Sequence, residues 1–179
     1  MSYRTTPNMK KIIAAHNSKI LNQKNVDPPC NCRKKEDCPR PQNGTCRSKN
    51  VVYQATVTTH QTPPQVETYT GMTATQFKDR VKNHEQSFDK ESKKSATILS
   101  QHIWELKNKD IDFDLSWKII GRAKPFSPVT GVCALCTLEK YFILTSESGA
   151  TLNRNYEIYK PCIHRIHLLL DKTWIQNSL

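Results

Sequence analysis

The sequence lacks a long hydrophobic run. No stretch approaches the roughly 20 consecutive apolar residues that a membrane-spanning helix requires, so no membrane segment is predicted. Residues 1–21 also lack an uninterrupted apolar segment followed by a small-residue cleavage site, which argues against a secretory signal. We therefore expect an intracellular protein.

Acidic residues are scarce in the first part of the chain. Residues 1–50 contain 11 Lys and Arg against 3 Asp and Glu, a difference of +8 within a formal net charge of +11. Lys and Arg displace condensed counterions from phosphates, so this segment favours a polyanion, either nucleic acid or an anionic membrane surface. A solvated basic face without a partner is the alternative.

Internal repeats are also absent, and from residue 51 onward the apolar residues follow the pattern of one small domain. Strand-like alternation and helix-like spacing succeed each other in the order β-β-α-α-β-α, which is typical of a small α/β domain. The expected elements are strands at 51–58, 66–71 and 113–121, helices at 76–88, 94–108 and 131–145, and a loop and last helix within 151–179.

The first predicted helix follows the tetrapeptide "TATQ" (73–76), which has the form of a capping box. In such a box, side chains at the helix start bind backbone amides of the first turn. Along the helix, one side is expected to carry Phe77, Val81, His84 and Phe88.

The third predicted helix carries an acid on its apolar side. Glu139 shares helical spacing with Val132, Leu135 and Phe142. A carboxylate on a buried face requires a partner or a metal ion. Glu139 is therefore a candidate site residue.

The first predicted strand carries a tyrosine on its apolar side. Val51, Tyr53, Ala55 and Val57 alternate with other positions, which predicts a strand with one buried face. Alone, this pattern favours a core tyrosine. If Tyr53 performs chemistry, its hydroxyl is expected to emerge at the edge of the buried face.

Four of the seven cysteines lie in an irregular, proline-containing segment at 27–50. Such a segment buries too little apolar surface to order itself, and four thiolates are a common structural zinc site. Two disulfides in a secreted domain are the alternative. Basic neighbours of the cysteines (Arg33, Lys34, Lys35, Arg40 and Arg47) are a candidate phosphate-binding surface. The expected zinc ligands are Cys30, Cys32, Cys38 and Cys46.

A second candidate zinc site combines a C-x2-C pair with a C-x-H pair near the end of the chain. His84 or His167 is an alternative ligand. The competing interpretation makes the two helical cysteines ordinary small core residues. The expected ligands are Cys133, Cys136, Cys162 and His164.

Five elements follow one another in a recognisable order. They are "VVY" (51–53), "YTG" (69–71), Arg80 in "FKDRVKNHEQSF", Glu139 in "CALCTLEKYFIL" and Asn153 in "LNRNYE". In this order the sequence resembles the GIY-YIG endonucleases, and most closely the version at the C-terminus of Penelope-like retroelement proteins. The two triplets differ from the family pattern at three positions but keep both tyrosines.

The resemblance also implies a domain organisation and a fold. It makes 1–25 the tail of a preceding reverse-transcriptase domain, 26–50 a zinc knuckle, 51–165 the nuclease domain and 166–179 a C-terminal extension. The implied fold is a small GIY-YIG domain whose three-stranded, mostly antiparallel sheet is flanked by helices. The chain is then a piece of a polyprotein.

What the resemblance implies for activity is hydrolysis of a DNA phosphodiester with Mg²⁺ or Mn²⁺. Glu139 would hold the catalytic metal ion, and Arg80 would stabilise the charge on the scissile phosphate. Tyr53 would activate the attacking water and Tyr69 would orient water or phosphate.

Two further residues complete the implied catalytic set. Asn153 would position the reacting group, and His84 would assist as a base or beside the leaving group. The expected partner is target DNA rather than a membrane, with element RNA reached through the adjoining reverse transcriptase, and the expected location is the nucleus. A catalytically inactive, zinc-dependent nucleic-acid-binding module is the alternative.

Overall fold

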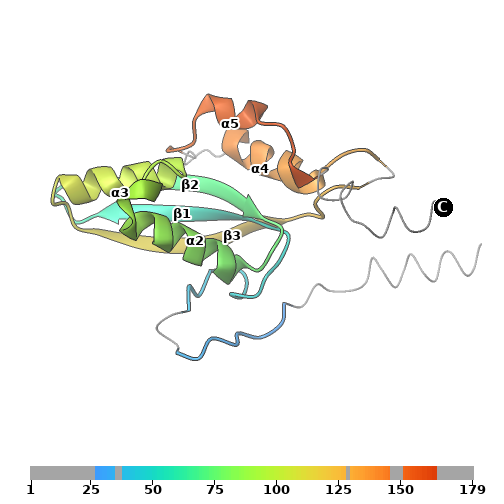
Figure 1. The fold of residues 1–179 in the computed structure, drawn as a ribbon, viewed down its shortest axis with the longest axis horizontal. Coiled ribbons are helices and arrows are strands. Elements are labelled where there is room, and N and C mark those ends of the chain that lie inside the picture. Colours follow the sequence, from blue (N-terminus) through green and yellow to red (C-terminus); the bar gives the residue numbers. More distant parts are fainter. Residues whose placement is uncertain (1–26, 35–37, 128–129, 146–150, 165–179) are drawn as a thin grey trace, which may run out of the picture.

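The computed structural model describes residues 27–34, 38–127, 130–145 and 151–164. At its centre lies a three-stranded antiparallel sheet, which confirms the predicted α/β class (Figure 1). In spatial order the strands are β2 (Val66–Thr73), β1 (Val51–Thr59) and β3 (Phe113–Arg122).

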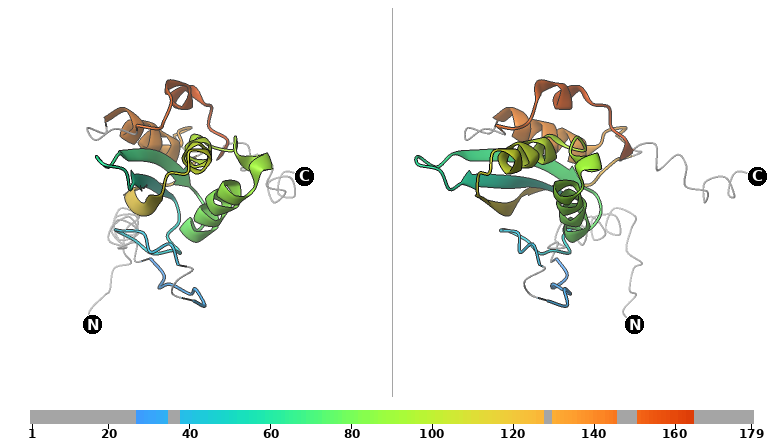
Figure 2. Two further views of the ribbon diagram at one scale, coloured as in Figure 1. Left: turned by 90° about the vertical axis from the view of Figure 1, so that its left-hand side faces the viewer. Right: turned by 60° about the vertical axis from the view of Figure 1, so that its left-hand side comes forward.

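Helices cover both faces of this sheet, and Figure 2 shows them on opposite sides of it. The element order confirms the predicted β-β-α-α-β-α succession, and the short helix at its end is the last helix expected within 151–179. One face carries α2 (Phe77–Asp89), the 3-10 turn η1 (Glu91–Lys93) and α3 (Ile98–Asn108), and the other carries α4 (Ala134–Thr145) and α5 (Asn155–Tyr159).

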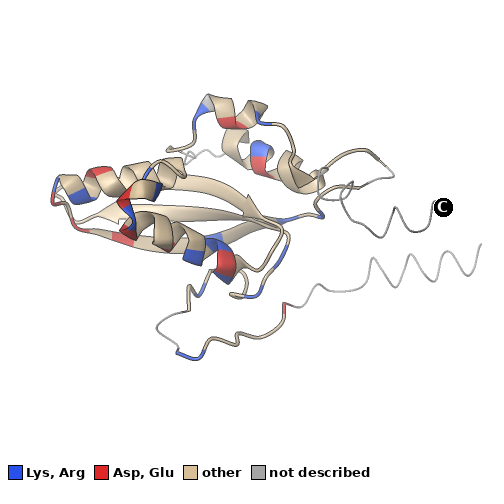
Figure 3. Ribbon diagram, in the orientation of Figure 1, with Lys and Arg blue, Asp and Glu red and all other residues tan. Residues whose placement is uncertain are grey.

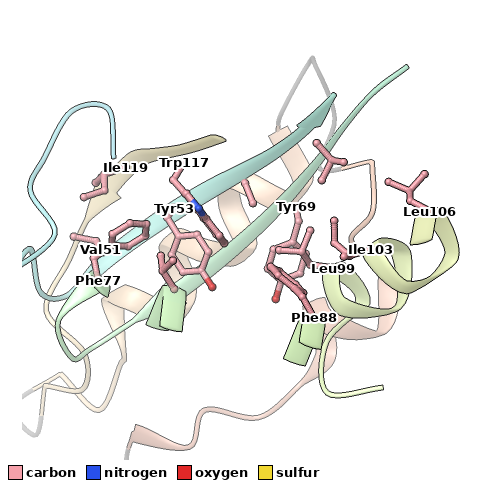
Figure 4. Packing of buried hydrophobic residues seen from close by; sticks show 13 residues of the cluster. Val51, Tyr53, Tyr69, Phe77, Phe88, Leu99, Ile103, Leu106, Trp117 and Ile119 are labelled. Carbon is pink, nitrogen blue, oxygen red and sulfur yellow. The ribbon is translucent and has the colours of Figure 1, made fainter. Parts of the chain in front are cut away.

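The main core lies between the sheet and helices α2 and α3 (Figure 4). The predicted apolar side of α2 is confirmed, since its four residues are all buried and His84 is among them. Tyr53 occupies the middle of this core, with ring contacts to Phe77 and Trp117 at centroid separations of 5.4 and 5.7 Å.

A second core lies on the opposite face of the sheet, under α4. Val52 is completely buried there with Leu135. Helix α4 approaches so closely that a Cβ atom at Gly121 would lie 2.6 Å from the Phe142 ring. The prediction that the first strand buries only one face is therefore wrong, because α4 covers the face that the alternation pattern left open.

The start of α2 differs from the prediction. The capping box at 73–76 does not form, because Thr73 still belongs to β2 and its hydroxyl interacts with Thr75. Gln76 is the N-cap residue and makes no side-chain cap bond. Carbonyl groups from the cysteine-rich segment instead accept the first backbone amides of the helix.

Two other helix starts were predicted too early. Helix α3 begins at Ile98 rather than at 94, where the Thr97 side chain accepts a bond from the Ser100 amide. Helix α4 begins at Ala134, so Val132 lies before it and is 52% exposed. The prediction that Val132 belongs to the apolar side of that helix is wrong.

The cysteine-rich segment is joined to the sheet. The Gln42 amide donates to the Trp117 carbonyl at 3.0 Å, and the Ile119 amide donates to the Gln42 carbonyl at 2.9 Å. Asp27 forms an ion pair with Arg122 at the end of β3. The predicted tail at 1–25 and extension at 166–179 lie outside the described residues.

In the described part of the chain, no helix has both the length and the apolar character needed to cross a bilayer.

Gly71 in the "YTG" triplet is expected to resist substitution. A Cβ atom there would lie 2.7 Å from the Tyr53 hydroxyl and 3.0 Å from the Tyr69 ring. Both rings are held by the core, so Gly71→Ala should lower the free energy of unfolding by about 1–3 kcal/mol in urea denaturation. In a Tyr53→Phe background, which removes the nearest atom, Gly71→Ala should cost less; equal costs in the two backgrounds would contradict this clash.

Candidate functional site

Three predicted catalytic residues are linked by hydrogen bonds beneath the sheet. The Tyr53 hydroxyl lies 2.7 Å from Nε2 of His84, and Nε of Arg80 donates to the same hydroxyl at 3.0 Å. Arg80 and His84 are one helical turn apart on α2, so one helix presents both partners to the tyrosine on β1. The hydroxyl is thus bound from two sides.

Burial sets the protonation of this group. It lowers the pKa of His84 to about 3, with a smaller contribution from the Arg80 cation, so the imidazole is neutral near pH 7. Burial also raises the pKa of Tyr53, although Arg80 opposes that shift. The neutral hydroxyl therefore accepts a bond from Nε of Arg80 and shares a second hydrogen bond with Nε2 of the neutral His84.

The enclosure of Tyr53 overturns one expectation. Its side chain has no exposed surface, so the prediction that its hydroxyl would emerge at the edge of the face is wrong. Figure 4 shows the rings of Tyr53 and Tyr69 side by side, with both hydroxyl oxygens on the same side of the sheet. The geometry makes Tyr53 a residue that holds Arg80 in place.

A cleft of about 630 Å³ is lined by residues of β2, α2, α3, α4 and α5. It collects side chains from helices on opposite faces of the sheet, since α2 contributes Arg80 and α4 contributes Glu139. Four of the six predicted catalytic residues line it, whereas Tyr53 and His84 do not. The four are Tyr69, Arg80, Glu139 and Asn153.

The surroundings of Glu139 disfavour its charged form. Burial, followed by the neighbouring Glu157 carboxylate, raises its pKa to about 7, although Arg80 opposes this shift. Within the described ranges, no side chain or backbone group forms a hydrogen bond or close ion pair with the Glu139 carboxylate. A half-buried acid in this situation gains a partner when a cation enters the cleft.

Asn153 is held against the outer edge of the sheet. Its Oδ1 accepts from the Thr70 amide at 2.7 Å, and its Nδ2 donates to the Thr70 carbonyl at 2.9 Å. The amide of Leu152 donates to the Thr68 carbonyl at 3.0 Å. Residues near 152 therefore cover the free edge of β2, which places Asn153 in the wall of the cleft.

Glu157 is a cleft residue that the sequence analysis missed. Its Oε2 accepts from Nδ2 of Asn153 at 2.7 Å and from the backbone amide of Arg154, the N-cap residue of α5, at 3.3 Å. The signal in the sequence was an acid three residues after a helix start, which by itself indicates a cap. Only the fold brings this acid near Glu139.

The first cysteine set is assembled as predicted. The ligand atoms of Cys30, Cys32, Cys38 and Cys46 all lie within 4.8 Å of one another. Two of the sulfur pairs are 3.4 and 3.7 Å apart. A zinc tetrahedron with bonds of about 2.3 Å separates sulfurs by about 3.8 Å, whereas a disulfide needs about 2.05 Å. These distances fit zinc and not the alternative of disulfides.

The second set is also assembled, with Nδ1 of His164 as its nitrogen ligand. This atom lies 3.4 Å from Sγ of Cys133, 3.3 Å from Sγ of Cys136 and 3.7 Å from Sγ of Cys162. The two sets together use all seven cysteines of the chain, and His164 accounts for the odd number.

Neither alternative histidine is needed for the second set. His84 is committed to Tyr53 in the core, and His167 lies outside the described residues. The interpretation of the helical cysteines as plain core residues explains their burial but not their convergence on one imidazole nitrogen.

Comparison of the chain with family models, curated proteins and solved structures gives no match.

We predict two zinc ions per chain, one for each cysteine-containing set. Elemental analysis of protein purified with a reducing agent should show this ratio, because each set offers four ligands at zinc-binding distances. Cys38→Ser and Cys162→Ser should each lower it to about one. His60→Ala, which changes an exposed histidine outside both sets, is the control. A ratio that does not change in either cysteine variant would contradict the assignment.

The enclosed Tyr53 hydroxyl is expected to stabilise the fold. Tyr53→Phe leaves Nε2 of His84 and Nε of Arg80 without this partner, so the free energy of unfolding should fall by about 1–3 kcal/mol. Urea denaturation followed by circular dichroism measures the difference. Tyr141→Phe, at a position 56% exposed, should change stability little. Equal effects of the two substitutions would show that the buried hydrogen bonds contribute nothing.

Proposed function

We propose that the chain is a divalent-metal-dependent DNA endonuclease of the GIY-YIG type. The observation that carries this proposal is that Arg80 and Glu139, from helices on opposite faces of the sheet, line one cleft with Tyr69 and Asn153. A guanidinium and a carboxylate that has no hydrogen-bond partner among the described residues, both lining one cleft, fit a phosphodiester and a metal ion better than they fit a structural role.

Glu139 would hold Mg²⁺ or Mn²⁺ in the cleft. Both ions favour carboxylate oxygens, and Mg²⁺ keeps several waters, for which the open cleft offers room. Glu157 brings a second negative charge close to Glu139, which favours a cation. When bound, the metal ion supplies Lewis-acid activation of the phosphate and of water.

Arg80 would stabilise the charge that develops on the scissile phosphate. Its Nε is bound to the Tyr53 hydroxyl, so the guanidinium is held before substrate arrives. Such a preorganised cation contributes more than a mobile one because no reorganisation is needed during the reaction. We therefore assign Tyr53, together with the neutral His84, to the positioning of Arg80.

The remaining cleft residues would orient the reactants. Tyr69 lines the cleft, and burial raises its pKa well above the ordinary value, so its phenol would donate hydrogen bonds to water or phosphate rather than remove a proton. Asn153 uses its amide to bind Thr70 and Glu157, so it would act by fixing the position of the Glu157 carboxylate.

Basic residues around the first cysteine set support DNA as the substrate. The described residues of the segment at 27–50 include five basic side chains and one acidic side chain, that of Asp27 (Figure 3). The Asp27 carboxylate is already paired with Arg122. Phosphate contacts of this kind position a duplex without reading its sequence. In this proposal the enzyme nicks nuclear target DNA to prime insertion of a Penelope-like element, whose RNA is bound by an adjoining reverse transcriptase. The five cations are Arg33, Lys34, Arg40, Arg47 and Lys49.

A plasmid-nicking assay tests the proposed function. With Mg²⁺ or Mn²⁺ the purified protein should relax supercoiled plasmid, and EDTA should abolish this. Glu139→Gln should lower the nicking rate by about 100-fold or more while DNA binding in a gel-shift assay persists. Glu105→Gln, at an exposed position on α3, is the matched control and should retain full activity.

Two outcomes would contradict the proposal. Binding of DNA without nicking at any divalent-metal concentration would favour the zinc-dependent binding module. Full nicking activity in Glu139→Gln would show that the reaction does not use this carboxylate.

A further inference from the structure

We propose that each zinc site positions one of the two helices that line the cleft. The first site fixes α2 and the second fixes α4. The first site consists of Cys30, Cys32, Cys38 and Cys46, and the second of Cys133, Cys136, Cys162 and His164. The first site then controls the position of Arg80, and the second controls the position of Glu139. In naming these two residues as catalytic, the inference rests on the proposed function.

The link from the first site to α2 is the N-terminal cap of the helix. The first amides of a helix have no partner within it, and the N-cap residue Gln76 provides no side-chain bond. Instead, the Lys78 amide donates to the carbonyl of Cys46 at 2.8 Å, and the Phe77 amide donates to the carbonyl of Ser48 at 2.9 Å. A zinc ligand thus caps the helix through its own backbone.

A side-chain contact reinforces this link. Nζ of Lys78 donates to Oδ1 of Asn31 at 2.8 Å, and Asn31 stands between two zinc ligands, Cys30 and Cys32. Arg80 follows Lys78 within the same turn of α2. An unfolded cysteine set would therefore release both the backbone cap and this contact immediately beside the arginine.

The capping loop is also anchored on its other side. The Ser48 hydroxyl donates to Oδ2 of Asp27 at 2.6 Å, and Nη1 of Arg122 donates to Oδ1 of the same carboxylate at 2.7 Å. The loop that caps α2 is consequently held between the cysteine set and the end of β3. Loss of the zinc would leave the loop held by the anchor at Asp27 and by the backbone bonds between Gln42 and β3.

The link from the second site to α4 is direct. Cys133 immediately precedes α4, and Cys136 lies within its first turn. Glu139 follows Cys136 by three residues, which places both on one side of the helix. Both also line the cleft, as does His164, which joins α4 to the end of the described chain.

The remaining contact between these segments is limited. Nζ of Lys140 donates to the Lys160 carbonyl at 3.0 Å, in an exposed setting. Helix α4 has two buried residues, Leu135 and the zinc ligand Cys136, and it also packs on the sheet through Leu138 and Phe142. The zinc site would add the contact that joins the first turn of α4, just before Glu139, to the segment at Cys162 and His164.

Amide hydrogen exchange and Mn²⁺ binding together test this division. The Lys78 amide reports on α2, and the Thr137 amide, which donates to the Cys133 carbonyl at 3.1 Å, reports on α4. In Cys38→Ser, protection of Lys78 should fall by about five- to tenfold, as expected for a lost cap, while that of Thr137 and the Mn²⁺ affinity stay unchanged.

The second variant should show the opposite pattern. In Cys162→Ser, protection at Thr137 and the Mn²⁺ affinity, measured by electron paramagnetic resonance, should each fall by about tenfold, while Lys78 stays protected. Each variant is the control for the other. The inference would be overturned if one variant lost protection at both amides, or if a variant lost protection at neither amide.

These readouts do not depend on cleavage. A protein that shows both selective exchange patterns but never nicks DNA would retain the positioning roles of the zinc sites and refute the proposed function. If the protein nicks DNA but a single cysteine variant loses protection at both the Lys78 and the Thr137 amides, the proposed function is supported and the separate positioning roles of the zinc sites are refuted.

Discussion

The hydrogen bonds at the buried Tyr53 hydroxyl determine the geometry of the whole site. A phenol enclosed among aromatic rings must find partners, and within the described part of the chain Arg80 and His84 of α2 supply them. These hydrogen bonds fix the rotation of α2 against the sheet, and the enclosed tyrosine leaves room only for glycine at position 71. Arg80 is held at the cleft because its Nε donates a hydrogen bond to the Tyr53 hydroxyl.

The cleft exists because β2 is an edge strand. Helices on the two faces of a sheet can bring side chains together only where the sheet ends, and the edge of β2 is such a place. The segment near Asn153 covers this edge, as exposed edges generally require, and also brings Glu157 close to Glu139. Two cysteine-containing sets with the geometry of metal sites lie beside the starts of α2 and α4.

Much of this architecture could be predicted from the sequence, because it rests on local patterns. Alternation located all three strands, and the spacing of Phe77, Val81, His84 and Phe88 identified the buried side of α2. The spacing of cysteines indicated both ligand sets. The second core at Val52 was missed because an alternation pattern does not reveal whether a helix covers the other face.

The failures concern contacts between residues far apart in the chain. The cap of α2 comes from Cys46 and Ser48, so the local "TATQ" motif was misleading. The enclosure of Tyr53 and the approach of Glu157 to Glu139 likewise depend on tertiary packing, which periodicity does not encode. At each of these points a local rule fails beside the candidate site.

Paramagnetic broadening by Mn²⁺ tests the central claim most directly, which is that Glu139 makes the cleft a divalent-cation site. In a ¹⁵N-labelled, zinc-loaded protein, sub-stoichiometric Mn²⁺ should broaden amide signals near Glu139, Arg80 and Asn153 and leave those at the distant end of β1 unaffected. The same titration of Glu139→Gln should leave the cleft signals sharp. Broadening centred elsewhere, or unchanged in the variant, would contradict the account.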